Sequence, residues 1–157
     1  MRAGEADRLR EIRLAALQAD PSAFGSTYDS DLARPAEWWE RIARLSDEGR
    51  EQRTYVLVDA DDRWLGLALV RPDDDSPGDA VLNAMWVAPE ARNQGAARAL
   101  CEACATWAAA QAFPRLNLNV KVDNAAARAA YAAAGFVEAR VEHDEYVMTR
   151  RLHHTRN

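Results

Sequence analysis

The stretch from Val87 to Leu100, VAPEARNQGAARAL, contains the residues whose types and spacing point most clearly to chemistry. An apolar run leads into it, a loop with one glycine follows, and an alanine-rich run then begins. Such a strand, loop and helix would point unpaired backbone N–H groups and the positive helix end outward, which favours an anion. Gly95 lets a ligand approach the backbone closely, and Arg92 adds a positive charge. The alternative is a glycine that merely relaxes a tight turn before a closely packed helix.

Two familiar phosphate-binding loops are excluded at this segment. The P-loop needs the pattern GxxxxGKS/T and the dinucleotide fingerprint needs GxGxxG, whereas the segment holds a single glycine, Gly95. The sequence therefore disfavours nucleoside triphosphates and NAD as ligands.

Cys101 and Cys104 form a CxxC pair, which could indicate redox chemistry or a metal site with His143, His153 and His154 downstream. Both thiols fall well inside a predicted helix, whereas redox pairs lie at a helix start, where the thiol pKa is lowered. We therefore expect packed, inert cysteines, no metal site, and unchanged activity when both are replaced by serine.

The composition bounds the remaining options. A chain of 157 residues predicts one domain over residues 1–157, ending in a tail at 152–157. The formal net charge is -5 and the 20 basic residues are scattered, which disfavours nucleic acid and anionic membranes as partners. No apolar run approaches a membrane span, and the first residues are charged where a secretory signal would be apolar, so we expect a cytoplasmic protein.

Hydrophobic periodicity predicts the elements that must position this chemistry. Residues 21–35 have the composition of a loop, and Asp123 or Asn124 can cap the last helix, which Gly135 would end. The predicted helices cover Glu5–Gln18, a segment starting at Pro35, Ala96–Ala112 and the run from Ala125 to Gly135; the predicted strands are Thr54–Val58, Trp64–Val70, Ala80–Val87, Arg115–Val122, Phe136–Glu142 and Glu145–Leu152. This order predicts an α/β or α+β fold with a mixed sheet and helices on both faces.

Two motifs resemble those of the GNAT superfamily of acyl-CoA-dependent N-acyltransferases. The run Arg92 to Ala97 is similar to its pattern Gln/Arg-x-x-Gly-x-Gly/Ala, and Asn124, Tyr131 and Gly135-Phe136 are similar to its second strand–helix element. Together with the closing strand, the resemblance covers nearly the whole chain in the right order. It implies a mostly antiparallel, twisted sheet whose central strands splay apart. The chain departs from the superfamily by lacking an obvious first strand, and by Asn93 and Ala96, where glycine and a bulkier aliphatic residue are common.

The resemblance also implies acetyl-CoA as co-substrate and a direct attack by an amine. The pantetheine arm would pair with the backbone of Met85 and Val87, and a backbone N–H near Val87 would polarise the thioester carbonyl. Asn124 would help to hold the arm, and Tyr131 would act as general acid for the leaving thiolate. The pyrophosphate would lie on the N–H groups of a cradle formed by Arg92, Asn93, Gln94, Gly95, Ala96, Ala97 and Arg98. A core aromatic without a catalytic role is the alternative for Tyr131.

The sequence does not identify the general base. Asn119 stands where the resembling ribosomal-protein Nα-acetyltransferases carry a glutamate base, which disfavours that activity. The candidate bases are Glu142, His143 and Asp144 in the last turn and Tyr28 and Asp29 after the first helix; a water relay is an equal alternative.

The acceptor is expected to contact residues 20–30 and the last hairpin turn, whose aromatic and acidic character suits a cationic amine of a small molecule or peptide. A non-catalytic acyl-CoA sensor, and an acetyltransferase acting on protein or aminoacyl-tRNA amines, are the rival functions. The scattered charge disfavours the tRNA-directed one. Edge strands of the last hairpin and tryptophans near the amino terminus are compatible with a homodimer.

Overall fold

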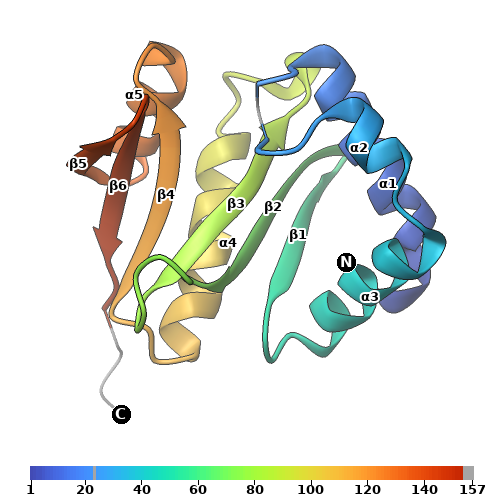
Figure 1. The fold of residues 1–157 in the computed structure, drawn as a ribbon, viewed down its shortest axis with the longest axis horizontal. Coiled ribbons are helices and arrows are strands. Elements are labelled where there is room, and N and C mark those ends of the chain that lie inside the picture. The colour runs from blue at the N-terminus through green and yellow to red at the C-terminus, as the bar shows by residue number, and fades with distance from the viewer. Residues whose placement is uncertain (23, 154–157) are drawn as a thin grey trace.

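The fold was analysed in a computed structural model, which describes residues 1–22 and 24–153 (Figure 1). The expected tail at 152–157 therefore lies mostly outside the described residues. The helices are η1 (Ala3–Glu5), α1 (Ala6–Ala19), α2 (Tyr28–Leu32), α3 (Ala36–Glu48), η2 (Pro89–Ala91), α4 (Ala96–Ala110) and α5 (Ala125–Ala133), where η marks a 3-10 turn. The strands are β1 (Arg53–Val58), β2 (Trp64–Pro72), β3 (Ala80–Val87), β4 (Arg115–Lys121), β5 (Val137–Glu142) and β6 (Glu145–Arg151).

The strands form one six-stranded sheet in the order β1-β2-β3-β4-β6-β5. Every neighbouring pair is antiparallel except β3 and β4, which are parallel and are connected through α4. Figure 1 shows β3 and β4 close together at one end and diverging toward the other. The predicted mixed, mostly antiparallel sheet with splayed central strands is confirmed.

Apolar side chains on the two faces of the sheet pack against different helices. On one face, residues such as Val70, Leu82 and Leu118 pack with the buried side of α4 and with Phe136. On the other, Leu67 and Trp86 pack with α1 and α3. Burial of these two apolar layers holds helices on both faces of the sheet, which confirms that part of the prediction.

The sequence-based strands agree with the structure to within two residues at each end, and β3 matches at both. The two 3-10 turns η1 and η2 were not predicted, and the one described α-helix missed is α2, which falls in the predicted loop. It begins at a capping box, in which the Thr27 hydroxyl accepts from the Ser30 N–H at 3.2 Å and the Ser30 hydroxyl accepts from the Thr27 N–H at 3.1 Å. Five residues are too few for an apolar period, so only this cap could have indicated the helix.

None of the described helices is both long and apolar enough to cross a membrane. Ahead of α1 lie Met1, Arg2 and the 3-10 turn η1, and the first described strand follows three α-helices.

Candidate active site

The divergence of β3 from β4 leaves one edge of β3 unpaired. Within these two strands the ladder consists of Ala80 opposite Leu116 and Val81 opposite Asn117, so β3 has no β4 partner from Leu82 onward. The backbone donors and acceptors along this edge are available to an extended ligand, as in strand addition.

A bulge interrupts β3 in its unpaired part. The register with β2 passes from Leu67 opposite Trp86 to Leu69 opposite Asn83, so two residues of β3 face one of β2. Ala84 lies in the bulge at φ 54°, in the left-handed region that non-glycine residues seldom adopt. The bulge changes the direction of the backbone ahead of Met85, which is half-buried, and of Val87, which is buried. Sequence patterning did not indicate it, because Ala84 carries no turn signal.

The predicted cradle lies between η2 and the first turn of α4. Asn93 and Gly95 both have left-handed backbone, at φ 62° and 80°, and Gly95 is the N-cap of α4. No side chain caps this helix, and its first turn carries no acidic residue. Among the backbone bonds of turns, loops and caps in the described residues, none is donated by an N–H from Asn93 to Arg98. A 15-residue helix with an uncapped N-terminus is a suitable site for an anion.

The space in front of the cradle is open. A Cβ built at Gly95 meets no atom within 4 Å. Ala96 is buried against the core, whereas Asn93, Gln94 and Arg98 are exposed. The helix N-terminus thus has room for an anion in contact with its backbone.

The Arg92 side chain is directed elsewhere than the cradle backbone. Its Nε donates to the carbonyl of Val87 at 2.9 Å, and its Nη2 donates to Asp20 Oδ2 at 2.8 Å. The same Asp20 oxygen accepts from Trp86 Nε1 at 2.8 Å. The Trp86 bond, and with it the Arg92 bond, lowers the pKa of Asp20. Asp20 begins the segment expected to contact the acceptor, but its contact with Arg92 was not predicted, because 72 positions separate the two residues.

Tyr131 lies on α5 and packs partly buried against the core cluster that includes α4. Its ring meets Phe136 edge to face at a centroid distance of 6.1 Å. Its hydroxyl makes no hydrogen bond within the part of the chain that the structure describes. Burial, followed by the nearby thiols of Cys101 and Cys104, raises the pKa of Tyr131 above its ordinary value of 10.0. The phenol is therefore fully protonated at neutral pH, as a proton donor must be.

Asn124 has a structural contact of its own. Its Oδ1 accepts from the Ala127 N–H at 3.1 Å, which caps α5 as the sequence predicts. The Nδ2 group donates no bond within the described residues and can still reach a ligand.

The candidate bases differ in how far they are already paired. Lys121 Nζ contacts Asp144 at 2.9 Å, and this bond lowers the pKa of Asp144. Glu142 pairs with Arg140 at 2.6 Å. The lowered pKa makes Asp144 a weaker base, and the Glu142 carboxylate is already engaged by an ion pair. His143 lies in the predicted turn at φ 56°. Tyr28 and Asp29 begin α2 and form no ion pair with another described residue.

The cysteines are buried, as predicted. Burial raises the pKa of Cys101 to about 12 and raises that of Cys104 further. Both thiols are therefore protonated and poor nucleophiles. Among the described residues no group of three or more His, Cys, Asp or Glu side chains is placed to hold a metal ion.

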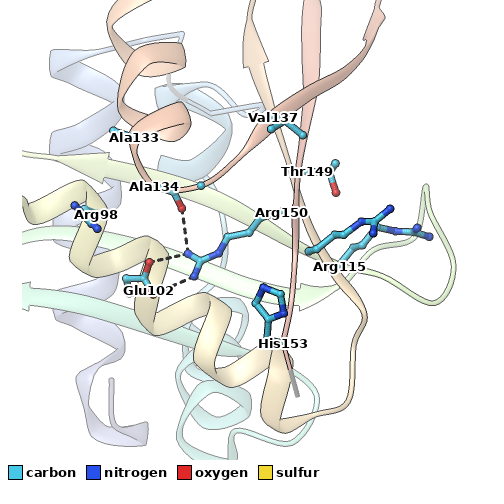
Figure 2. A pocket seen from close by; sticks show the side chains of 11 residues that line it. Arg98, Glu102, Arg115, Ala133, Ala134, Val137, Thr149, Arg150 and His153 are labelled. Carbon is cyan, nitrogen blue, oxygen red and sulfur yellow. Dashed lines mark hydrogen bonds and ion pairs between the residues drawn. The ribbon is translucent and has the colours of Figure 1, made fainter. Parts of the chain in front are cut away.

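A cavity of about 730 Å³ lies beside α4 and β6 (Figure 2). It is lined by residues of α4, the end of α5, β5, β6 and the first residue of β4, Arg115, and of the predicted site residues it includes only Arg98. Arg150 crosses it, donating to both Glu102 oxygens at 2.7 and 3.2 Å and to the Ala134 carbonyl at 3.1 Å. It is an open surface depression away from the predicted chemistry.

Comparison with known proteins agrees with this geometry. A family model described as the acetyltransferase (GNAT) family matches residues 10–136. No protein with curated annotation matches the sequence.

Solved structures of low sequence identity share the fold. A GNAT-family acetyltransferase from Streptococcus pneumoniae superposes with a TM-score of 0.78 at 21% identity, covering 98% of this chain and 96% of that one. The PaiA N-acetyltransferase of Thermoplasma acidophilum, in complex with coenzyme A, gives 0.77 at 12% identity, with 96% and 95% covered. The ribosomal-protein-S18-alanine N-acetyltransferase of Escherichia coli gives 0.60 at 20% identity, with 79% and 80% covered.

Proposed function

The chain belongs to the acetyltransferase (GNAT) family, and on that premise we propose that it transfers the acetyl group of acetyl-CoA directly to a primary amine. The observation that carries the proposal is the uncapped N-terminus of α4, placed directly after the strand that separates from β4. A phosphate-bearing head and an extended arm would each find unpaired backbone donors there.

Two segments would hold acetyl-CoA. The N–H groups from Asn93 to Arg98 would bind the pyrophosphate, and the β3 edge at Met85 and Val87 would pair with the pantetheine arm. The Val87 carbonyl already accepts from Arg92, so its N–H is the more available partner. The free Nδ2 of Asn124 would donate to the arm from the other side.

The reaction then needs one oxyanion donor and one proton donor. The attacking nitrogen forms a bond to the thioester carbon, and a backbone N–H near Val87 would stabilise the charge that develops on the carbonyl oxygen. The nitrogen of the tetrahedral intermediate would release its extra proton to water. When the carbon–sulfur bond breaks, the Tyr131 hydroxyl would give its proton to the thiolate and recover one from solvent. No acyl-enzyme is formed, in keeping with buried, protonated cysteines.

The amine must lose a proton before it attacks, because an alkyl ammonium group has a pKa near 10.4. Glu142 and Asp144 are engaged by Arg140 and Lys121, so we assign this step to a water relay or to Tyr28, Asp29 or His143 at the open end of the site.

The acceptor is expected to be a cationic amine that contacts the first turn of α2 and the last hairpin turn. Asn119 is exposed on β4 and carries no carboxylate, which disfavours the alanine acetylation for which the Escherichia coli neighbour is named.

A turnover assay tests the proposal. The purified chain and acetyl-CoA are mixed with a panel of amines, namely a polyamine, an aminoglycoside, free amino acids and a lysine peptide, and released CoA thiol is followed together with the mass of the product. We expect amine-dependent thiol release with a mass gain of one acetyl group for at least one class. Binding of acetyl-CoA without turnover on any class would favour the sensor function and overturn the proposal.

A further inference from the structure

Asp20 joins three segments that are distant in the sequence. It follows α1, and its Oδ2 accepts from Trp86 on β3 and from Arg92 in the loop before α4, both at 2.8 Å. Arg92 in turn donates to the Val87 carbonyl at 2.9 Å. The carboxylate and the guanidinium together connect the end of α1, the end of β3 and the start of the cradle.

The cradle has a backbone conformation that needs such support. Asn93, next to Arg92, has φ 62°, and Gly95 has φ 80°. Asparagine enters the left-handed region more readily than most non-glycine residues, but the conformation is still uncommon and is favoured by contacts that hold the loop. The described contacts that do so are the two bonds of Arg92 and a bond from Gln94 Nε2 to the Glu90 carbonyl at 3.2 Å.

The positive charge of Arg92 is also partly neutralised by Asp20. Side chains of Arg92 and Asp20 are 44% and 38% exposed and form an ion pair at 2.8 Å, so the guanidinium is partly neutralised beside the cradle. A carboxylate at this distance weakens the attraction between the arginine and a pyrophosphate, so the pair does not favour phosphate binding by the Arg92 charge. The pairing is instead consistent with a structural role of Arg92 in holding the loop.

We propose that Asp20 is a positioning residue, which acts through Arg92 to hold the cradle in its ligand-binding conformation. The inference rests on the proposed function, because it assigns a role at the acetyl-CoA site. It opposes the simpler assignment in which Arg92 binds the phosphates by its charge and Asp20 only neutralises it.

The two assignments predict opposite effects of removing Asp20. Acetyl-CoA is titrated calorimetrically into the wild type, Asp20→Ala, Arg92→Ala and the double variant. If Asp20 holds Arg92, each single variant weakens binding by about tenfold, and the double variant is no weaker than either, since all three lose one linkage. The KM for acetyl-CoA rises in parallel while kcat stays within about twofold.

Two further variants keep the test independent of folding defects, which thermal unfolding of each protein monitors. Asp20→Asn keeps an oxygen that can accept both bonds, and we expect it to retain affinity within about threefold. Trp86→Phe removes the other bond of the same carboxylate and leaves Arg92 paired, so we expect wild-type affinity.

The two assignments also determine which results would contradict the inference. Unchanged or tighter binding by Asp20→Ala, with loss in Arg92→Ala, would make Arg92 a direct phosphate ligand and overturn the inference. Additive losses in the double variant, equal losses in Asp20→Asn and Asp20→Ala, or a loss in Trp86→Phe would also overturn it. Failure of the wild type to bind would reject the proposed function itself.

Discussion

At the scale of single residues, the proposed chemistry depends on one phenol in an apolar environment. Tyr131 packs against Phe136 and lies near the two thiols of α4. The environment keeps the proton on the hydroxyl, because it raises the pKa of Tyr131, and leaves that hydroxyl without a partner among the described residues. A ligand sulfur would be its first acceptor.

Replacing Tyr131 by phenylalanine tests this role. We expect kcat to fall by about a hundredfold or more, as for the loss of a general acid, while acetyl-CoA affinity and thermal stability are preserved. Tyr55→Phe is the matched control, since Tyr55 is also half-buried against the same core and its pKa is also raised by burial. Equal kcat values for the two variants would show that Tyr131 is only a core aromatic.

The raised pKa of Tyr131 also determines the shape of the pH profile. A general acid is active below its pKa, so the alkaline loss that its deprotonation causes falls above pH 10, its ordinary value. In wild-type enzyme we therefore expect the rate to rise with pH as the amine deprotonates.

Residue types alone predicted the cradle glycine and the helix cap, but not the contacts of Arg92. The sequence shows that Arg92 is charged and close to Gly95. It does not show that Asp20 meets it, since that contact depends on how α1 packs on the sheet.

At the scale of the elements, the site depends on where two helices begin. The N-terminus of α4 is left open for a ligand, whereas that of α5 is closed by Asn124, whose Oδ1 accepts from Ala127. The sequence predicted both starts because glycine, asparagine and alanine runs are strong local signals. It could not predict the β3 bulge at Ala84 or the five-residue α2, where no local period or turn residue marks the structure.

Variants of Asn124 separate its two roles. Asn124→Ala removes the cap and is expected to lower the free energy of unfolding by about 1 kcal/mol, whereas Asn124→Ser keeps a capping oxygen and is expected to be nearly neutral. Both variants lose the side-chain Nδ2 group, so both should bind acetyl-CoA more weakly if that group holds the arm. Urea unfolding and calorimetric titration measure the two effects. Wild-type affinity in Asn124→Ser would limit Asn124 to capping.

At the scale of the whole molecule, a buried ion network ties the helical layer together. The Asp31 carboxylate on α2 is fully buried and contacts Arg34 Nε at 2.9 Å and Arg13 Nη2, on α1, at 3.1 Å. Burial alone would raise the pKa of Asp31, but bonds from Arg34 and Arg13 outweigh it and lower that pKa. The network fixes α2, whose first turn we assign to acceptor contact, against α1.

Removing the Asp31 charge should destabilise the whole fold. We expect Asp31→Asn to lose about 3 kcal/mol in the free energy of unfolding at pH 7, because two guanidinium groups are left without their counter-charge. Asp29→Asn, an exposed change on the same helix, should stay within about 0.5 kcal/mol.

The effect of Asp31 should depend on pH in a defined direction. Its folded pKa is lowered, so its contribution is present above the unfolded value of about 3.9 and is lost as the pH falls through the folded pKa. The difference between Asp31→Asn and the wild type should therefore narrow in acid. A constant difference down to pH 2 would contradict this account.

The architecture of the molecule was more predictable than its site. Apolar periodicity was enough for the strands and for the helices that cover both faces of the sheet, because burial of apolar surface governs them, whereas the splayed centre followed only from the family resemblance. The site depends on contacts such as that of Asp20 with Arg92. These contacts join segments that are distant in the sequence, so no local pattern of residues predicts them.

The most direct test of the account is calorimetric titration of acetyl-CoA into the wild type, Gly95→Arg and Gly78→Arg. Both glycines have left-handed backbone, at φ 80° and 96°, and a Cβ at either meets nothing within 4 Å, so both variants carry a similar backbone cost. Gly95 lies in the cradle and Gly78 precedes the opposite end of β3. We expect tight binding by the wild type and Gly78→Arg and its loss in Gly95→Arg. Equal binding by all three, or no binding by the wild type, would contradict the assignment of the cradle.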